Sequence, residues 1–282
     1  MSIGPFRHPG VRIGFVVGIL LTAFAVTGRF GGQSRQREED PSRWASVNGH
    51  PMYYEIHGHG SPLIMLHGGG DSVAGSFSQQ IDVLARNHRV IAPEQVGQGH
   101  TPDVDSELSY SQMMEDTAAL MRQLQVSGAD VVGWSDGGNI ALMLAARYPD
   151  LVRRVVISGA NISPDGLRAG EIDAIRTAAR ESPAGQSSID NKLNTLWLTS
   201  PTPAELSVDV LSHIEQPVLV ISGDHDVIRL EHTLKIYHAL PHAQLYVLPD
   251  TQHGTFAERP QWVNPVLQWF LNEDATTVTA SS

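Results

Sequence analysis

From Pro62 onward, the sequence alternates short apolar runs with longer segments whose apolar residues recur at helical spacing, and this alternation most constrains the fold. The apolar runs predict buried strands at residues 63–66, 89–91, 130–133, 154–158, 218–222 and 244–248. The segments between them predict helices at residues 77–86, 110–124, 137–148, 230–240 and 261–271. Such alternation is typical of an α/β domain, in which helices cover both faces of a mainly parallel sheet.

Two further strands precede this alternation. Residues 44–47 and 52–56 flank Asn48-Gly49, a pair that tolerates positive φ and predicts an antiparallel hairpin, which gives a sheet of eight strands. Residues 161 to about 214 break the alternation with a patchily helical stretch longer than a crossover needs. This stretch predicts a small helical cap over the carboxyl edge of the sheet. We expect one folded domain over residues 44–272 and a disordered tail over 273–282.

The N-terminal residues have the layout of an export signal. Arg7 and Arg12 precede an uncharged run at residues 13–28, and residues 29–43 have the composition of a flexible linker. As a helix, the 16 residues of the run would span about 24 Å, less than the roughly 30 Å of a membrane's hydrocarbon core. This length favours a cleaved signal peptide over a short membrane anchor. Either one places the domain outside the cytoplasm, whether secreted, periplasmic or anchored, with membrane attachment only through this segment.

Composition argues against several classes of function. The formal net charge is -11 and the 19 Lys and Arg residues form no basic stripe, so a nucleic-acid partner is not expected. The chain has no cysteine, and therefore neither disulfides nor thiolate metal sites. His57 and His59 form an H-x-H pair without further ligands, and we interpret them as surface residues. We predict no metal, no cofactor and a small-molecule substrate as the partner.

The segment Gly133-Trp-Ser-Asp-Gly137 stands between a predicted strand and an Ala-rich helical segment. A G-x-S-x-G sequence in this context is typical of a sharp turn, the nucleophile elbow, that exposes a serine hydroxyl. Side chains at the two glycine positions would collide where the strand and helix backbones approach each other. Ser135 is therefore the candidate nucleophile, and a tight connection without chemistry is the alternative.

A serine hydroxyl needs a base to take its proton, and the base needs an acceptor on its far nitrogen. Among 13 histidines, His253 is the candidate base because it lies in a loop between the last predicted strand and the final helix. Most of the others, including His232 on a predicted helix, are expected at the surface. Asp224 and Asp226 directly follow a predicted strand, and position alone does not separate them as the acid. Asp250 shares the loop of His253, where a turn role is more typical.

A hole of backbone donors for the oxyanion is the last component of such a site. The segment His67-Gly-Gly-Gly70 follows the strand predicted at residues 63–66. With no side chains in the way, the amide of Gly69 can approach the oxyanion, together with the amide of Asp136 directly after the nucleophile. A phosphate-binding loop is excluded because no Gly-Lys-Ser/Thr follows.

With these four parts in order, residues 44–271 resemble the α/β-hydrolase family, and residues 133–161 resemble its biphenyl-hydrolase-like, or valacyclovirase, branch. The resemblance implies the α/β-hydrolase fold and a serine hydrolase that cleaves carboxylic esters through an acyl-enzyme intermediate. In the family the acid is usually the last residue of a G-x-x-D pattern, which selects Asp226 over Asp224. A lactonase, an amidase or a cofactor-free perhydrolase can use the same triad, and a non-catalytic ligand receptor can share the scaffold.

Four residues bear on the substrate. In the resembled branch an acidic residue at the position of Asp136 recognises the amino group of amino-acid esters, which would offset its repulsion of the oxyanion. The alternative is a side chain turned away from the site and favoured there by the helix macrodipole. Trp134 and Gly70 are further candidate substrate contacts, although Trp134 could instead pack under the elbow. Trp197, in the predicted cap, either touches substrate or anchors the cap.

The chain departs from the family in the loop that follows the strand predicted at residues 89–91. The family pattern D-x-R-G-x-G-x-S reads Glu94-Gln-Val-Gly-Gln-Gly-His-Thr101 here. Val96 stands in place of the usual arginine and Thr101 in place of serine. We expect this loop to shape the edge of the site, so the resemblance alone does not transfer the substrate of the branch.

Overall fold

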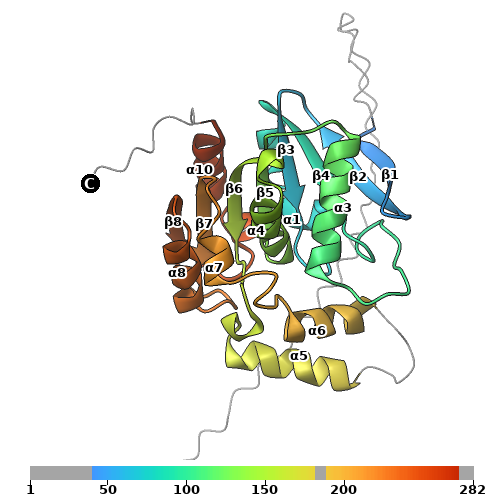
Figure 1. The fold of residues 1–282 in the computed structure, drawn as a ribbon. Helices are drawn as coiled ribbons and strands as arrows, with labels where there is room; N and C mark the ends of the chain where they lie inside the picture. The colour runs from blue at the N-terminus through green and yellow to red at the C-terminus, as the bar shows by residue number, and fades with distance from the viewer. Residues whose placement is uncertain (1–39, 182–188, 273–282) are drawn as a thin grey trace, which may run out of the picture. The chain divides into compact units, whose positions relative to one another are not determined.

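The computed structural model describes residues 40–181 and 189–272, and its central element is an eight-stranded sheet (Figure 1). The strands stand in the order β1-β2-β4-β3-β5-β6-β7-β8; β1–β2 and β2–β4 are antiparallel and all other neighbours are parallel. Their bounds are β1 Ser42–Val47, β2 His50–His57, β3 Ser61–Leu66, β4 His88–Pro93, β5 Ala129–Trp134, β6 Val152–Ser158, β7 Val218–Gly223 and β8 Ala243–Leu248. The predicted fold class is confirmed, and the β1–β2 turn has the positive φ expected, 44° at Asn48 and 94° at Gly49.

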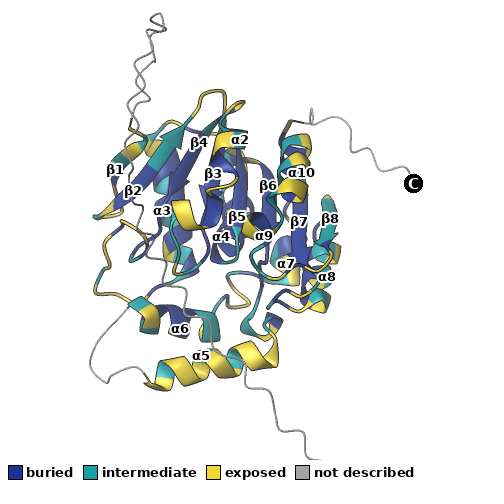
Figure 2. Cartoon of the chain, turned by 180° about the vertical axis from the view of Figure 1, so that it is seen from behind, coloured by how far each residue is buried: buried dark blue, intermediate teal, exposed yellow. Residues whose placement is uncertain are grey.

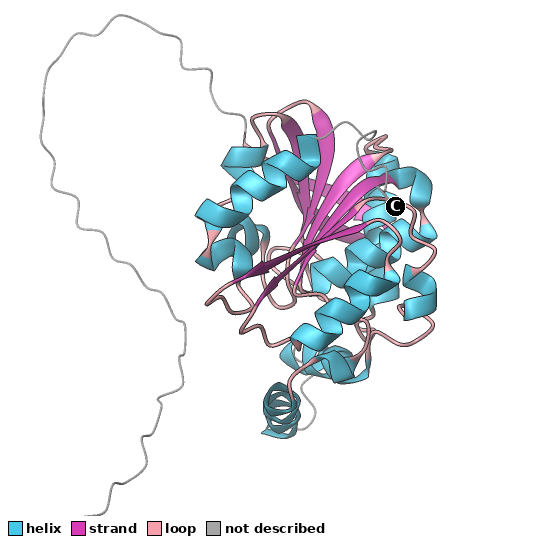
Figure 3. Cartoon of the chain, turned by 90° about the vertical axis from the view of Figure 1, so that its left-hand side faces the viewer, coloured by secondary structure: helices cyan, strands magenta, loops and turns pink. Residues whose placement is uncertain are grey.

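Helices cover both faces of this sheet and create two apolar cores (Figure 3). Successive strand residues point to opposite faces, so Ile64 and Leu66 pack in one core, and Leu63 and Met65 in the other. The first core is covered by α3 Tyr110–Gln123, α4 Asp136–Arg147 and α8 Leu230–Ala239, and the second by α1 Val73–Phe77, α2 Ile81–Leu84, α9 Thr255–Glu258 and α10 Pro260–Asn272. Burial on both faces explains why the parallel strands read as continuous apolar runs.

The single helix predicted at residues 77–86 is wrong, because only the short helix α2 lies within this range, and the preceding helix α1 ends at its first residue. Helix α1 ends at Phe77 and α2 begins at Ile81, with Gln80 between them. Gln80 is fully buried, and its Nε2 donates to the carbonyl of Phe256 at 2.9 Å and to Oδ1 of Asn264 at 3.0 Å. Hydrogen bonds between segments this far apart in sequence do not affect the local spacing of apolar residues, so the sequence pattern did not predict the break in the helix.

The cap between β6 and β7 contains the 3-10 turn Pro164–Gly166 and the helices α5 Ala169–Glu181, α6 Ile189–Thr199 and α7 Val208–Leu211. Helices α5 and α6 lie beyond the carboxyl ends of the strands (Figure 1). Helix α6 is fastened to the body, because Leu193 and Leu196 are buried and Nζ of the buried Lys192 lies 3.0 Å from both carboxylate oxygens of Asp103. Helix α5, by contrast, buries no side chain and is exposed along most of its length (Figure 2).

The predictions for the two ends of the chain fall mostly outside the described residues. These include the signal peptide or anchor at residues 1–28, most of the linker and the tail at 273–282. The linker was expected to reach residue 43, but β1 already begins at Ser42, which pairs with Glu55. The Ser42 hydroxyl also shares a hydrogen bond of 3.0 Å with the hydroxyl of Tyr53, a contact that composition does not reveal. None of the described helices is long and apolar enough to cross a membrane.

His232 is buried rather than at the surface, where we expected it. It lies on α8, and its Nε2 accepts a hydrogen bond from the backbone N–H of Ile162 at 3.0 Å. Burial lowers the pKa of His232 from an ordinary 6.5 to about 4. The ring is therefore neutral near pH 7 and joins α8 to the chain that enters the cap.

The pH dependence of stability tests this role of His232. The folded pKa lies below the unfolded one, so the unfolded chain takes up the proton first and stability falls as the pH drops from 6.5 toward 4. His232→Gln supplies an amide oxygen as an acceptor that does not titrate. We expect the melting temperature of the wild type to fall more steeply between pH 7 and pH 4.5 than that of His232→Gln, with the exposed His238→Gln on the same helix as the control. Parallel melting curves for wild type and His232→Gln would contradict this.

Candidate active site

Ser135 lies on the sharp turn between β5 and α4. Its φ of 54° and ψ of -118° are strained for a residue with a side chain, and its N–H donates to the carbonyl of Ser158 on β6 at 2.8 Å. A Cβ on Gly137 would lie 1.9 Å from the carbonyl oxygen of Leu66, so only glycine lets α4 begin this close to the end of β3. This packing places the serine at the carboxyl edge of the sheet.

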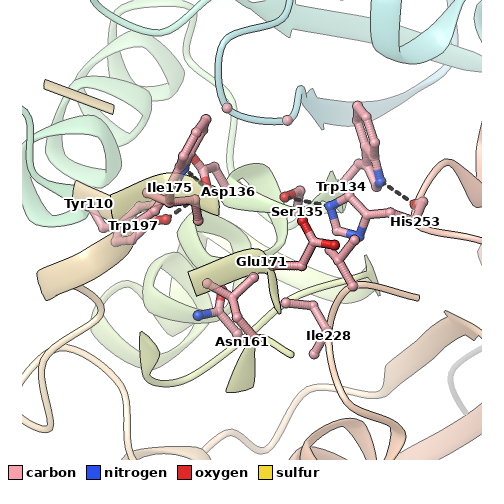
Figure 4. Close-up of a pocket in the computed structure, with 14 residues that line it drawn as sticks. Tyr110, Trp134, Ser135, Asp136, Asn161, Glu171, Ile175, Trp197, Ile228 and His253 are labelled. Carbon is pink, nitrogen blue, oxygen red and sulfur yellow. Dashed lines mark hydrogen bonds between the residues drawn. The ribbon is translucent and has the colours of Figure 1, made fainter. Parts of the chain in front are cut away.

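Ser135, His253 and Asp226 form one hydrogen-bonded row, of which Figure 4 shows the bond between Ser135 and His253. Nε2 of His253 lies 2.9 Å from Oγ of Ser135, and Nδ1 of His253 lies 2.7 Å from Oδ1 of Asp226. With Nδ1 donating to the carboxylate, Nε2 is free to accept the serine proton. Nε1 of Trp134 donates to the carbonyl of His253 at 2.8 Å and so positions the loop that carries the histidine.

The three aspartates that the sequence analysis considered as the acid differ in how far their side chains are buried. Asp226 is fully buried and contacts His253. Asp224 is partly exposed, and its Oδ1 accepts the N–H of Thr251 at 3.1 Å. The side chain of Asp250 is 93% exposed. Of the three, the structure brings only Asp226 to the imidazole.

Two backbone amides complete the arrangement. Gly69 and Asp136 line the same cavity as Ser135, and within the described residues neither N–H has a protein acceptor. His67 holds the glycine loop in place, since its Nε2 accepts the N–H of Gln95 at 2.9 Å and its Nδ1 donates to the carbonyl of Gly68 at 2.8 Å. Burial lowers the pKa of His67, which favours the neutral ring that these two bonds require. The geometry suits an oxyanion hole at Gly69 and Asp136.

The Asp136 side chain points toward the cavity rather than away from it, and protein donors already engage both of its oxygens. The Tyr110 hydroxyl donates to Oδ1 at 2.7 Å, and Nε1 of Trp197 lies 3.1 Å from Oδ1 and 3.0 Å from Oδ2. Burial raises the pKa of the Asp136 carboxyl, while the bonds from Trp197 and Tyr110 oppose the rise. The carboxylate thus joins α4 to α3 and to the cap helix α6. It also requires glycine at position 69, because a Cβ on Gly69 would lie 2.1 Å from Oδ2.

A cavity of about 250 Å³ opens over Ser135 and His253. Of the residues that the sequence singled out, it is lined by Gly69, Trp134, Ser135, Asp136, Trp197 and His253. Gly70 is not part of the lining, and its N–H donates to Oε1 of Gln98 at 2.7 Å. Sequence reasoning missed other lining residues, among them Tyr110, Asn161, Glu171, Ile175 and Ile228 (Figure 4). Glu171 and Ile175 lie on α5, and no pattern in the sequence indicates which face of a cap helix meets the cavity.

The loop that departs from the family pattern does not line this cavity. Val96 is buried in the first core. Oγ1 of Thr101 accepts the N–H of Tyr53 at 3.0 Å and donates to the carbonyl of Glu94 at 2.7 Å. Both residues that differ from the family pattern therefore make contacts within the body of the protein. We expected Val96 and Thr101 to shape the edge of the site, but neither of them lines the cavity.

The two histidines of the H-x-H pair have different surroundings. Nε2 of His57 lies 2.7 Å from a carboxylate oxygen of Glu55, and His59 is exposed. Across residues 40–181 and 189–272, no group of three or more His, Asp or Glu side chains is placed to hold a metal ion.

Comparisons with known proteins agree with the fold. A family model described as "alpha/beta hydrolase fold" matches residues 61–198. The chain is 28% identical over 260 residues to a 2-hydroxymuconate semialdehyde hydrolase of Pseudomonas sp. (strain CF600), covering 79% of this chain and 91% of that protein. It is 25% identical over 249 residues to serine hydrolase BPHL of Mus musculus, covering 80% and 84%. The enol-lactonase structure from Burkholderia xenovorans LB400 has a TM-score of 0.69 at 20% identity, covering 82% of this chain and all of that one, which shows the fold alone.

A pair of matched variants tests the choice of acid. Asp226→Asn removes the carboxylate that orients His253, so we expect the turnover of an activated ester such as p-nitrophenyl acetate to fall about a thousandfold or more. Asp224→Asn makes the same chemical change two residues away and should leave the rate close to that of the wild type. Losses of equal size in the two variants would contradict the assignment of Asp226.

A second pair tests the bond between Trp197 and Asp136. Trp197→Phe keeps an aromatic ring but removes a donor from a buried carboxylate, so we expect it to lower the free energy of unfolding by about 1–3 kcal/mol. The KM for an ester should also rise, because α6 lines the cavity through this residue. Trp262→Phe on the exposed face of α10 is the control. Denaturant unfolding and steady-state kinetics measure both effects, and equal behaviour of the two variants would rule out this anchoring role.

Proposed function

We propose that this chain, which has the α/β-hydrolase fold and matches a family model of that description over residues 61–198, is a serine hydrolase that cleaves carboxylic esters through an acyl-enzyme intermediate. The observation that carries this proposal is the row Asp226–His253–Ser135, which opens into a cavity that is also lined by Gly69 and Asp136, whose amides have no acceptor in the part of the chain that the structure describes. Each of these parts has a defined role in acyl transfer.

In the acylation half of the proposed reaction, Oγ of Ser135 attacks the ester carbonyl while Nε2 of His253 takes its proton. The buried Asp226 carboxylate stabilises the imidazolium that forms. The amides of Gly69 and Asp136 donate to the developing oxyanion. The tetrahedral intermediate then collapses, His253 gives its proton to the leaving alkoxide, and the alcohol departs.

Deacylation repeats these steps with water as the nucleophile. Nε2 of His253 takes a proton from the water that attacks the acyl carbonyl, and the same two amides receive the second oxyanion. Collapse of this intermediate returns the proton to Oγ of Ser135 and releases the carboxylic acid. The acyl group is held in the cavity of about 250 Å³ while this water attacks.

Leaving-group chemistry supports esters over other acyl compounds as the proposed substrates. An alkoxide leaves with the help of one proton, which the His253 imidazolium supplies. Hydrolysis of a C–C bond releases a carbanion, which needs an electron sink within the substrate. Hydrolysis of an amide releases an amine, which leaves less readily than an alkoxide. A lactone is a cyclic ester and follows the same steps, so lactonase activity lies within this proposal. A binding-only receptor would give no reason for the strained φ of 54° at Ser135.

Replacement of the nucleophile tests the function directly. We expect Ser135→Ala to lower kcat for p-nitrophenyl esters by at least about a thousandfold, because the acyl-enzyme cannot form. Ser212→Ala, at an exposed position after α7, should match the wild type. A fluorophosphonate should add one adduct mass to the wild type and to Ser212→Ala, and none to Ser135→Ala. Equal ester turnover by Ser135→Ala and wild type would refute the proposed function.

A further inference from the structure

The lining of the cavity is negative. Asp136 and Glu171 contribute carboxylates to it, and none of the described lining residues is a lysine or an arginine. The Tyr110 hydroxyl and the Trp197 indole engage the oxygens of Asp136, which is buried. The charge of Asp136 is therefore partly compensated by these donors.

Glu171 is in a different position. It lies in the first turn of α5, is exposed, and its side chain makes no hydrogen bond or ion pair with any described residue. Figure 4 shows its carboxylate directed toward Ser135 and His253, with Ile175 from the next turn of α5 also lining the cavity. Arg168, three residues earlier, uses its Nε to donate to the carbonyl of Asp226 at 2.6 Å and forms no ion pair with Glu171. Among the described residues, Glu171 thus presents a negative charge without an ion-pair partner on the side of the cavity where Ser135 and His253 lie.

An exposed carboxylate acts on a nearby charge through water-screened attraction or repulsion. A substrate that carries a carboxylate close to its scissile bond would be repelled by Glu171 as it enters, and a substrate with an ammonium group would be attracted. The preference for one substrate charge over another is measured as a ratio of kcat/KM values, because kcat/KM includes both the binding of the substrate and the transition state.

We propose that Glu171 is the specificity-determining residue of this cavity, which selects against esters with an anionic group near the scissile bond and favours cationic ones. This role rests on the proposed ester hydrolysis at Ser135. It assigns the choice of substrate charge to the cap helix α5, while Asp136 serves the architecture of the site.

Three p-nitrophenyl esters of equal acyl length test the proposal, with acyl chains that end in trimethylammonium, in the isosteric tert-butyl group, or in carboxylate. For the full-length wild type we expect kcat/KM to decrease in that order. Glu171→Gln should reduce the ratio of cationic to anionic turnover by about tenfold at low ionic strength, and less at high salt. Glu171→Lys should invert the order. Asp173→Asn removes the same charge from the outer side of α5 and should leave the ratio unchanged.

The outcomes separate this proposal from the proposed function. If wild type hydrolyses the esters but Glu171→Gln keeps the wild-type ratio, or if Asp173→Asn shifts the ratio equally, the role of Glu171 is refuted and ester hydrolysis stands. If wild type turns over none of the three esters, both proposals fall. Because Glu171 is exposed, both of its variants should melt at the wild-type temperature. Asp173→Asn, outside the lining, should hydrolyse the neutral ester at the wild-type rate, and for the Glu171 variants the ratio of cationic to anionic turnover within each variant is the readout.

Discussion

The contact between the start of α4 and the end of β3 governs the rest of the site. Gly137 brings the helix backbone against the carbonyl of Leu66, closer than any side chain would allow. That contact accompanies the positive φ of Ser135 and places Asp136 at the first turn of the helix, where its amide has no acceptor among the described residues and the residue lines the cavity. It also brings the glycine loop after β3 beside the same helix, so that the amide of Gly69 lies in the same cavity. One close approach thus sets both the proposed nucleophile and the proposed oxyanion hole.

Sequence reasoning predicted what depends on local pattern. Burial on both faces produces continuous apolar runs, and positive φ at Asn48 and Gly49 requires a particular residue pair, so strands and hairpin could be located. The nucleophile elbow and the glycine loop could be located because each depends on glycines at fixed positions in a short segment. The choice between Asp224 and Asp226 was different, because both follow β7 and only burial against His253 separates them. That choice came from family resemblance.

Tertiary contacts account for what the sequence did not reveal. Gln80 interrupts a predicted helix through partners far along the chain, and His232 is buried because a backbone N–H from another segment needs its ring nitrogen. The sequence alone did not decide whether the side chain of Asp136 points into the site or away from it. Its actual partners, Tyr110 and Trp197, come from α3 and α6, and their approach depends on how the cap sits on the sheet. Glu171 was missed for the same reason.

The cap helices α5 and α6 differ in how much of their surface is buried against the body of the protein. This difference affects which substitutions the protein can accept during evolution. Helix α6 shares buried side chains and a buried lysine with the body, so most substitutions there would also disturb folding. Helix α5 buries nothing, yet two of its residues face the cavity. Surface substitutions of this kind usually alter stability by less than about 0.5 kcal/mol. Helix α5 is therefore where mutation can retune substrate choice almost independently of the fold, and where directed evolution has the most freedom.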